Sequence, residues 1–343
     1  MIIVMEPMAT AEQIQRVIDK LESNGYRINV NSGDVMTVIA AIGDKRLIQP
    51  ESIASIDGVR EVKLIQEPFK MASRESQKED TVIEFHNGVK IGGNNRAVVM
   101  AGPCSVEEDY NGLLDVAKSV RDNGGKFLRG GAFKPRTSPY DFQGMEERGL
   151  EYLAKAAGET DLLIITEVMD SLDVLLVAEY ADILQVGARN MQNYKLLKML
   201  GKINKPVMLK RGPAATIREF LLAAEHVMHA GNPNVILCER GIKGIDSTYT
   251  RNTLDIAAVP IIKKYSHLPV IVDPSHGTGR RYLIEPMSKA ALVVGADGIM
   301  VEVHHNPDIA VSDGAQSLTI PQFEKMMGSV NQLIGRINYA NNH

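Results

Sequence analysis

The chain has 343 residues, 44% of them hydrophobic, and a formal net charge of −4. This length suits one large domain or a large domain with an appendage, and the near-neutral charge argues against a general nucleic-acid binder, which needs a broad basic face. No apolar run reaches membrane-spanning length, and the N-terminus lacks a signal-peptide pattern. Two cysteines, Cys104 and Cys238, make no disulfide scaffold, so we expect a cytoplasmic protein without membrane or nucleic-acid partners.

The first 70 residues are predicted to form a ferredoxin-like domain. Its expected elements are a strand at 2–5, a helix that begins with a Thr10/Gln13 capping box, a hairpin of 26–30 and 35–42, a short helix after Pro50 and a strand at 59–65. The resulting order β-α-β-β-α-β is ferredoxin-like. The polar segment 71–80 is interpreted as a linker to a catalytic domain that covers 81–343.

Eight short apolar runs follow, with helical patterns between them. They are AVVMAG (97–102), KFLRGG (126–131), LLIITE (162–167), DILQVG (182–187), PVMLKRG (206–212), VILCERG (235–241), PVIVDPS (269–275) and DGIMVEV (297–303). Buried parallel strands have such continuous apolar runs. Eight units over about 250 residues predict a (β/α)8 barrel, with a hairpin at 81–92 closing its bottom. A doubly wound open sheet is the structural alternative, although no G-x-G-x-x-G motif follows a strand.

Reactive side chains follow nearly every one of these runs, at the face where a barrel gathers its chemistry. The basic candidates are Arg129, Lys134, Arg136, Arg189, Lys210, Arg211 and Arg240, and Thr137, Glu167, Glu239 and Asp273 lie at the same strand ends. Arg suits bidentate phosphate and carboxylate recognition, and Lys serves as a point charge. The cations predict a ligand with a phosphate and a carboxylate, or two phosphorylated ligands; Arg211 could equally be a structural ion-pair partner.

A second set of strand-end residues predicts a metal site. Cys104, His276, Glu302 and Asp313 would bring a thiolate, an imidazole and two carboxylates to one barrel mouth, a donor set typical of divalent transition metals. Cys238 lies inside an apolar run and is interpreted as a core residue. His304 follows Glu302 by two positions, which makes it a candidate near the site.

The strand-end motifs also resemble a known family. They are AGPCS (101–105), LRGGAFKPRTSPYDFQG (128–144), QVGARNMQN (185–193), LKRG (209–212), LCERG (237–241), RNTLD (251–255), DPSHGTGRR (273–281), VEVH (301–304) and SDGAQSL (312–318). From about residue 80 to the end, the chain resembles type Iβ 3-deoxy-D-arabino-heptulosonate 7-phosphate (DAHP) synthases. The KPRTS element is specific, because the sister octulosonate-phosphate synthases resemble K-A-N-R-S at this position.

The resemblance implies condensation of phosphoenolpyruvate with erythrose 4-phosphate, the entry to the shikimate pathway. It assigns Cys104, His276, Glu302 and Asp313 to the metal, with Mn²⁺ as first choice and Zn²⁺, Fe²⁺, Co²⁺ or Cd²⁺ as alternatives. The residues implied to bind phosphoenolpyruvate are Arg129, Lys134, Arg189, Lys210 and Arg240. Arg136 and Thr137 would bind erythrose 4-phosphate. Feedback control by tyrosine or phenylalanine and a homotetramer are further implications.

The catalytic roles are expressed as hypotheses. Lys134 is the candidate for proton transfer, and Glu167 would orient the attacking water or pair with a cation. Asp273, which we place among the substrate-site residues, would order His276. Three alternatives remain: a Schiff-base aldolase with Lys210 as nucleophile, the octulosonate-phosphate synthase, and a non-catalytic amino-acid sensor.

Overall fold

The computed structural model describes residues 1–33, 36–43, 48–63, 68–134, 138 and 140–337. The chain divides into two units, residues 1–79 with 265–267, and residues 80–264 with 268–343. No helix among the described residues has the length and apolar character needed to cross a membrane.

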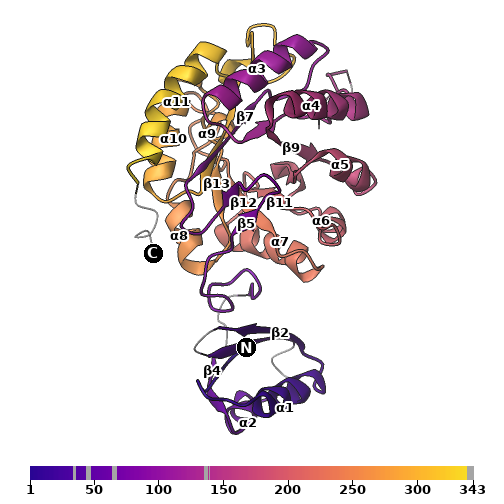
Figure 1. Ribbon diagram of the computed structural model, residues 1–343, viewed down its shortest axis with the longest axis vertical. Coiled ribbons are helices and arrows are strands. Elements are labelled where there is room, and N and C mark those ends of the chain that lie inside the picture. The colour runs from indigo at the N-terminus through magenta and orange to yellow at the C-terminus, as the bar shows by residue number, and fades with distance from the viewer. Residues whose placement is uncertain (34–35, 44–47, 64–67, 135–137, 139, 338–343) are drawn as a thin grey trace. The chain divides into compact units, whose positions relative to one another are not determined.

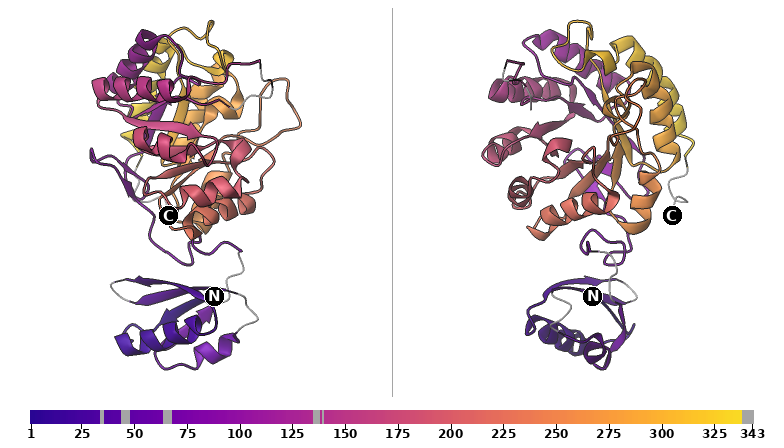
Figure 2. Two further views of the ribbon diagram at one scale, coloured as in Figure 1. Left: turned by 90° about the vertical axis from the view of Figure 1, so that its right-hand side faces the viewer. Right: turned by 180° about the vertical axis from the view of Figure 1, so that it is seen from behind.

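The N-terminal unit is a four-stranded antiparallel sheet in the order β2-β3-β1-β4. Its elements are β1 (Ile2–Met5), α1 (Ala11–Glu22), β2 (Arg27–Ser32), β3 (Thr37–Ile42), α2 (Pro50–Ala54) and β4 (Val59–Lys63). Both helices cover one face of the sheet (Figures 1 and 2). The helix α1 begins with the predicted capping box, in which Thr10 Oγ1 accepts from the Gln13 amide and Gln13 Oε1 accepts from the Thr10 amide. The ferredoxin-like prediction is therefore confirmed.

The second unit is a closed barrel of parallel strands, as predicted. The strands are β7 (Val98–Gly102), β8 (Phe127–Arg129), β9 (Leu163–Val168), β10 (Ile183–Val186), β11 (Val207–Lys210), β12 (Val235–Glu239), β13 (Val270–Val272) and β14 (Gly298–Glu302). Because β14 pairs with β7, the sheet has no edges, and the doubly wound alternative is wrong.

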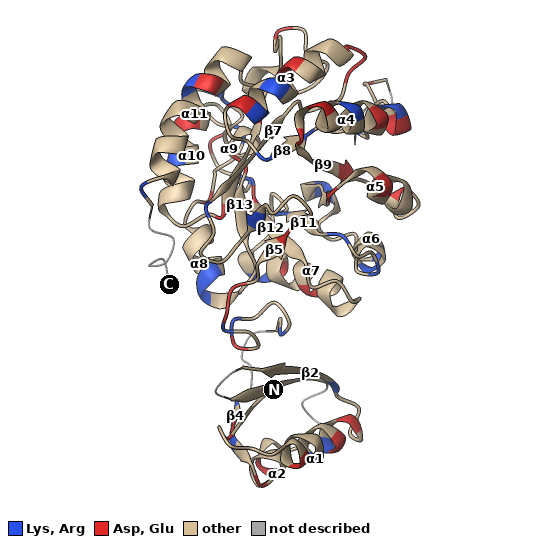
Figure 3. Cartoon of the chain, viewed as in Figure 1, with Lys and Arg blue, Asp and Glu red and all other residues tan. Residues whose placement is uncertain are grey.

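Helices alternate with the barrel strands, and the longer ones form the outer layer (Figure 1). They are α3 (Tyr110–Asp122), α4 (Glu146–Thr160), α5 (Val174–Tyr180), α6 (Tyr194–Leu200), α7 (Ile217–His229), α8 (Ala258–Tyr265), α9 (Pro274–Thr278), α10 (Arg281–Val293) and α11 (Ile320–Ile334), with 3₁₀ turns η1 (Ala188–Asn190) and η2 (Gly314–Gln316). Basic and acidic positions are interspersed along outer helices such as α3 and α4 (Figure 3).

A short antiparallel hairpin packs against the apolar interior of the barrel. Its strands β5 (Ile83–Glu84) and β6 (Lys90–Ile91) pair as predicted. Phe85 lies edge-to-face on Phe127, with ring centroids 5.1 Å apart. The hairpin belongs to the same buried cluster as the interior strand residues, so apolar side chains fill this end of the barrel.

The segment predicted as a linker has fixed hydrogen-bond partners. Ser73 forms an isolated antiparallel bridge with Ser266, and the Arg74 amide donates to the Tyr265 carbonyl over 2.8 Å. These bonds explain why residues 265–267 group with residues 1–79.

Candidate active site

A cavity of about 290 Å³ opens at the C-terminal ends of the barrel strands. It is lined by Cys104, Arg129, Lys134, Glu167, Gln185, Gly187, Ala188, Arg189, Lys210, Pro213, Arg240, Arg251, Asn252, His276 and Asp313. All five cations that the sequence associates with phosphoenolpyruvate are in this set. The structure therefore brings them together around one volume large enough for a small anionic ligand.

The two-residue repeat of β-strands explains how polar groups reach this cavity. Side chains two positions apart lie on the same face of a strand, so the second residue after an interior apolar position also points inward, one layer higher. The interior apolar and following polar residues form the pairs Phe127/Arg129, Ile165/Glu167, Ile183/Gln185, Met208/Lys210, Cys238/Arg240, Ile271/Asp273 and Met300/Glu302. Hydrophobic filling and polar site thus come from the same strands.

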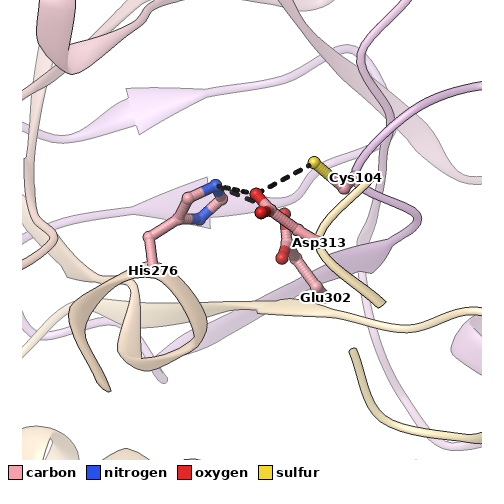
Figure 4. A group of neighbouring side chains, drawn as sticks. All are labelled: Cys104, His276, Glu302 and Asp313. Carbon is pink, nitrogen blue, oxygen red and sulfur yellow. Dashed lines mark hydrogen bonds and ion pairs between the residues drawn. The ribbon is translucent and has the colours of Figure 1, made fainter. Parts of the chain in front are cut away.

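Four potential metal ligands meet at the edge of the cavity (Figure 4). One donor atom from each of Cys104, His276, Glu302 and Asp313 lies within 4.8 Å of the others. The nearest approaches run from Cys104 Sγ to Asp313 Oδ2 (3.5 Å), from Asp313 Oδ2 to His276 Nε2 (3.7 Å), and from His276 Nε2 to Glu302 Oε1 (3.3 Å). Three strand ends and one loop supply them, as the sequence predicted.

Asp313 adopts a backbone conformation that few residues other than glycine adopt. Its φ is 49° and its ψ is 30°, in the left-handed region, immediately before η2. Such strain is concentrated at functional sites, where the surroundings hold it in place. Here it turns the carboxylate toward His276 and Cys104.

Asp273 orients His276. Its Oδ1 accepts from the His276 backbone amide over 2.9 Å, and its Oδ2 accepts from Nδ1 of the ring over 2.8 Å. Lys210 Nζ donates to the same Oδ2. Because Nδ1 is used by the carboxylate, Nε2 faces the other three ligands as a free lone pair, the arrangement that metal-binding histidines need. Asp273 is predicted to be a substrate-site residue, but it does not line the cavity. Its contacts are with His276 and Lys210, which do.

Burial and neighbouring charges determine the protonation states of this group. Burial lowers the pKa of His276, which favours neutral imidazole. Burial alone would raise the pKa of Asp273, but the facing His276 and Lys210 hold it well below its usual range. Burial, followed by the Glu302 charge, raises the pKa of the Cys104 thiol to about 11. Because metals bind the thiolate, metal binding here would release a proton.

Lys134 lies beside the ligand group, and its Nζ donates to the Cys104 carbonyl (2.9 Å) and to Sγ (3.1 Å). Arg129 Nη1 donates to Glu302 Oε1 over 2.7 Å and to the Pro103 carbonyl over 3.1 Å. Both cations therefore link the cavity to the four potential metal ligands.

Other predicted residues lie elsewhere. Arg136 and Thr137 fall outside the described residues. Arg211 is buried and forms ion pairs with Glu239 (2.8 Å) and Asp255 (2.9 Å), which supports the structural interpretation. His304 Nε2 lies 3.3 Å from Glu107 and does not join the four ligands. Cys238 is buried in the barrel core, as predicted.

Sequence reasoning missed several residues of the cavity wall. Gln185 follows interior Ile183 by two positions, and this offset could have revealed it. Arg251 and Asn252 belong to the RNTLD motif in the loop before α8, and no strand-end rule points to them. Loop residues of this kind are found only when the folded chain brings them to the cavity.

Gly187 gives a direct test of Glu167. Its backbone (φ −63°, ψ 154°) accepts any residue, but a Cβ at this position would collide with Glu167 Oε1. We expect Gly187→Ala to displace this carboxylate and lower turnover by about 10- to 100-fold, a large part of a typical acid–base contribution. Steady-state kinetics would measure the loss.

The matched control is Gly158→Ala, where nothing lies within 4 Å of the added Cβ, on helix α4. This change should leave turnover unaltered and raise stability by roughly 0.5–1 kcal/mol. Equal turnover in the two variants would remove Glu167 from the reaction.

Two family models match the chain. The DAHP synthetase I family matches residues 79–337, and the DAHP synthase ferredoxin-like domain matches residues 1–67. The chain belongs to the DAHP synthetase I family. The resemblance read from the strand-end motifs is thus confirmed, together with the prediction that the chain is an enzyme of the DAHP synthase type.

Relatives support this membership over nearly the whole chain. Phospho-2-dehydro-3-deoxyheptonate aldolase of Thermotoga maritima is 50% identical over 333 residues, covering 97% of both chains. A crystal structure of the T. maritima protein has a TM-score of 0.77 at 49% identity, again with 97% of each chain covered. A 2-dehydro-3-deoxyphosphooctonate aldolase of Desulfosudis oleivorans is 30% identical over 266 residues, which cover 72% of this chain and 93% of that protein.

Proposed function

We propose that this member of the DAHP synthetase I family condenses phosphoenolpyruvate with D-erythrose 4-phosphate and water, giving DAHP and inorganic phosphate, with a divalent metal ion bound. The observation that carries the proposal is a single cavity that joins five cations to a Cys/His/Glu/Asp ligand group. The full-length relative named as a heptonate aldolase favours this product over the octulosonate.

Two anionic substrates repel each other, and the cavity cations offset that repulsion. Phosphoenolpyruvate carries a phosphate and a carboxylate, and Arg129, Arg189 and Arg240 offer guanidinium groups suited to both. Lys210 adds a point charge held in place by Asp273. Fixing the phosphoenolpyruvate in this way places its carbon 3 for attack, an advantage of position and orientation.

The ligand group fits a divalent transition metal. One thiol, one imidazole and two carboxylates, with donor atoms within 4.8 Å, match the soft and borderline donors such ions prefer. Mn²⁺ is our first choice, with Zn²⁺, Fe²⁺, Co²⁺ and Cd²⁺ as alternatives. When bound here, the ion would supply Lewis-acid polarisation of the aldehyde oxygen.

The chain's own residues would manage the protons. Carbon 3 of phosphoenolpyruvate bonds to the aldehyde carbon, and water adds its oxygen to carbon 2 and releases one proton. The carbon 2–oxygen bond to phosphate then breaks, and the proton lost by water balances the one gained by the aldehyde oxygen. Lys134, hydrogen-bonded beside Cys104, is placed to give a proton to the former aldehyde oxygen. Glu167, on the cavity wall beside Gln185, would orient the water.

One assay separates this proposal from its rivals. Phosphate release should occur with erythrose 4-phosphate, stop in EDTA and return with Mn²⁺. Release with arabinose 5-phosphate would instead identify an octulosonate-phosphate synthase. Borohydride trapping of substrate on Lys210, whose amine pairs with the buried Asp273, would identify a Schiff-base aldolase. If phosphate were released with neither aldose, the non-catalytic amino-acid sensor would become the favoured hypothesis.

The second substrate has its own test. Arg136→Ala is expected to raise the KM for erythrose 4-phosphate about tenfold or more, because a charge-assisted contact to its phosphate contributes roughly 1.5–3 kcal/mol. The KM for phosphoenolpyruvate should change much less. Initial rates with each substrate varied in turn would measure both constants, and equal changes would contradict the assignment.

Regulation and assembly are part of the proposal. A ferredoxin-like domain on the first enzyme of the shikimate pathway suits feedback control, so we propose tyrosine or phenylalanine as effector and a homotetramer in the cytoplasm. Rates with each amino acid and light scattering of the full chain would test these points. Unchanged rates with both amino acids would indicate a structural role for the domain.

A further inference from the structure

Gln316 lies behind the two carboxylates of the ligand group and contacts one of them directly. It belongs to the 3₁₀ turn η2 and is buried, with 3% of its surface exposed. Its Nε2 donates to Glu302 Oε2 over 2.5 Å. Its Oε1 accepts from Arg251 Nη1 over 3.0 Å. Because both ends of the amide are used, its orientation is determined: the NH₂ faces the carboxylate and the carbonyl faces the guanidinium.

Arg251 continues this connection to the second carboxylate. The same Nη1 donates to Asp313 Oδ1 over 3.2 Å. Gln316 and Arg251 together therefore form a bridge, which we call the carboxylate bridge, from Glu302 Oε2 to Asp313 Oδ1. The two oxygens that it binds are the ones that do not face the other ligands.

The opposite oxygens face the centre of the group. Glu302 Oε1 lies 3.3 Å from His276 Nε2 and also accepts from Arg129 Nη1 over 2.7 Å. Asp313 Oδ2 lies 3.7 Å from the same histidine nitrogen and 3.5 Å from Cys104 Sγ. In Figure 4 both carboxylates point toward His276 and Cys104. Each carboxylate thus has one oxygen directed inward and the other held by the carboxylate bridge.

We propose that Gln316 and Arg251 are positioning residues that make Glu302 and Asp313 each offer a single oxygen to the metal ion. The inference rests on the proposed metal site and adds to it the control of how the carboxylates bind. A carboxylate with both oxygens free can swing or bind through both, which alters coordination number and geometry. Partners behind metal ligands prevent this motion by hydrogen bonding.

The chemistry of the bridge makes Gln316 hard to replace. A glutamate would keep an acceptor for Arg251 but would set its own carboxylate against Glu302. A methionine has a similar length but has no hydrogen-bond donor and only a weak acceptor. The hydrogen bonds to Glu302 and from Arg251 would therefore both be lost. Arg251→Met would release Asp313 while leaving the Gln316 link to Glu302 intact.

The test is Mn²⁺ affinity of the full chain, measured by equilibrium dialysis, with electron paramagnetic resonance of the bound ion. We expect Gln316→Met, Gln316→Glu and Arg251→Met each to weaken Mn²⁺ binding about 10- to 100-fold, the usual effect of removing such partners, and to change the spectrum. The double variant Gln316→Met/Arg251→Met should lose less than the product of the single losses, because both act through one bridge.

The control is Gln332→Met, the same change on the exposed surface of α11, which should alter affinity less than about twofold. Unchanged affinity and spectrum in the folded Gln316 variants, with wild-type binding intact, would overturn the carboxylate bridge alone. Absence of Mn²⁺ binding by the wild type, and of any other divalent ion, would overturn the metal site and the bridge with it. Thermal melting of the metal-free proteins identifies any variant whose loss reflects unfolding.

Discussion

Cys104→Ala is expected to lower turnover on the order of 10³-fold, because several kcal/mol of Lewis-acid stabilisation correspond to about three factors of ten in rate. The thiol is one of four donors in the ligand group, and Sγ also accepts from Lys134 over 3.1 Å. Its loss would weaken the metal site and free Lys134 from one of its two described contacts. Phosphate release and Mn²⁺ binding would measure both effects.

Cys238→Ala is the matched control. This second buried thiol lies in the apolar barrel interior, one layer below the cavity residue Arg240. Its truncation should cost about 1 kcal/mol of stability, since about one methylene equivalent of apolar volume is lost, and leave Mn²⁺ binding intact. Full activity of Cys104→Ala with added metal, or a loss of metal binding in Cys238→Ala, would contradict the ligand assignment.

Lys210→Met should affect both catalysis and stability. Lys210 lines the cavity and pairs with Asp273, whose carboxylate is completely buried. Removing one partner of a buried pair usually costs about 3–5 kcal/mol, and we expect the lower end because His276 still bonds Asp273. Loss of the cation should also weaken phosphoenolpyruvate binding and turnover. Urea unfolding and steady-state kinetics would measure the two effects.

The same variant should change how stability depends on pH. Burial acts to raise the pKa of Asp273, and His276 and Lys210 hold it well below its usual range. A carboxyl with a lowered folded-state pKa adds stability above its unfolded pKa of about 4, and this contribution disappears as pH falls through the folded value. Without Lys210 the folded-state pKa should rise, so this contribution should be smaller and its loss should be complete at a higher pH, which unfolding curves between about pH 3 and 7 would show.

Lys263→Met provides the comparison. Lys263 Nζ pairs with the buried Asp297 over 2.9 Å, on the strand-entry side of β14 and outside the cavity. It should lose stability and keep the KM for phosphoenolpyruvate. Wild-type kinetics in Lys210→Met would make Lys210 a structural residue only. A borohydride-trapped adduct that forms in the wild type and is absent from this variant would instead support the Schiff-base alternative.

The barrel was predictable because its information is local. Each strand is a short run of apolar residues, and eight such runs separated by helical patterns leave few arrangements that bury them all. The same period-two repeat that fills the interior with Ile165 and Met300 directs Glu167 and Glu302 inward two positions later. The candidate ligands Cys104 and His276 could be proposed because they follow strand ends, where a barrel collects its reactive groups.

The sequence by itself therefore determined the fold class, the family and the residues that converge on the barrel mouth. Only the tertiary structure decided which of them touch: Arg211 pairs with Glu239 and Asp255, Asp273 bonds His276 and Lys210, and Gln316 holds Glu302. Such contacts join residues as far as 209 positions apart, as between Cys104 and Asp313. Hydrogen bonds depend on differences of tenths of an ångström and on direction, and these are set by the packing of the complete core.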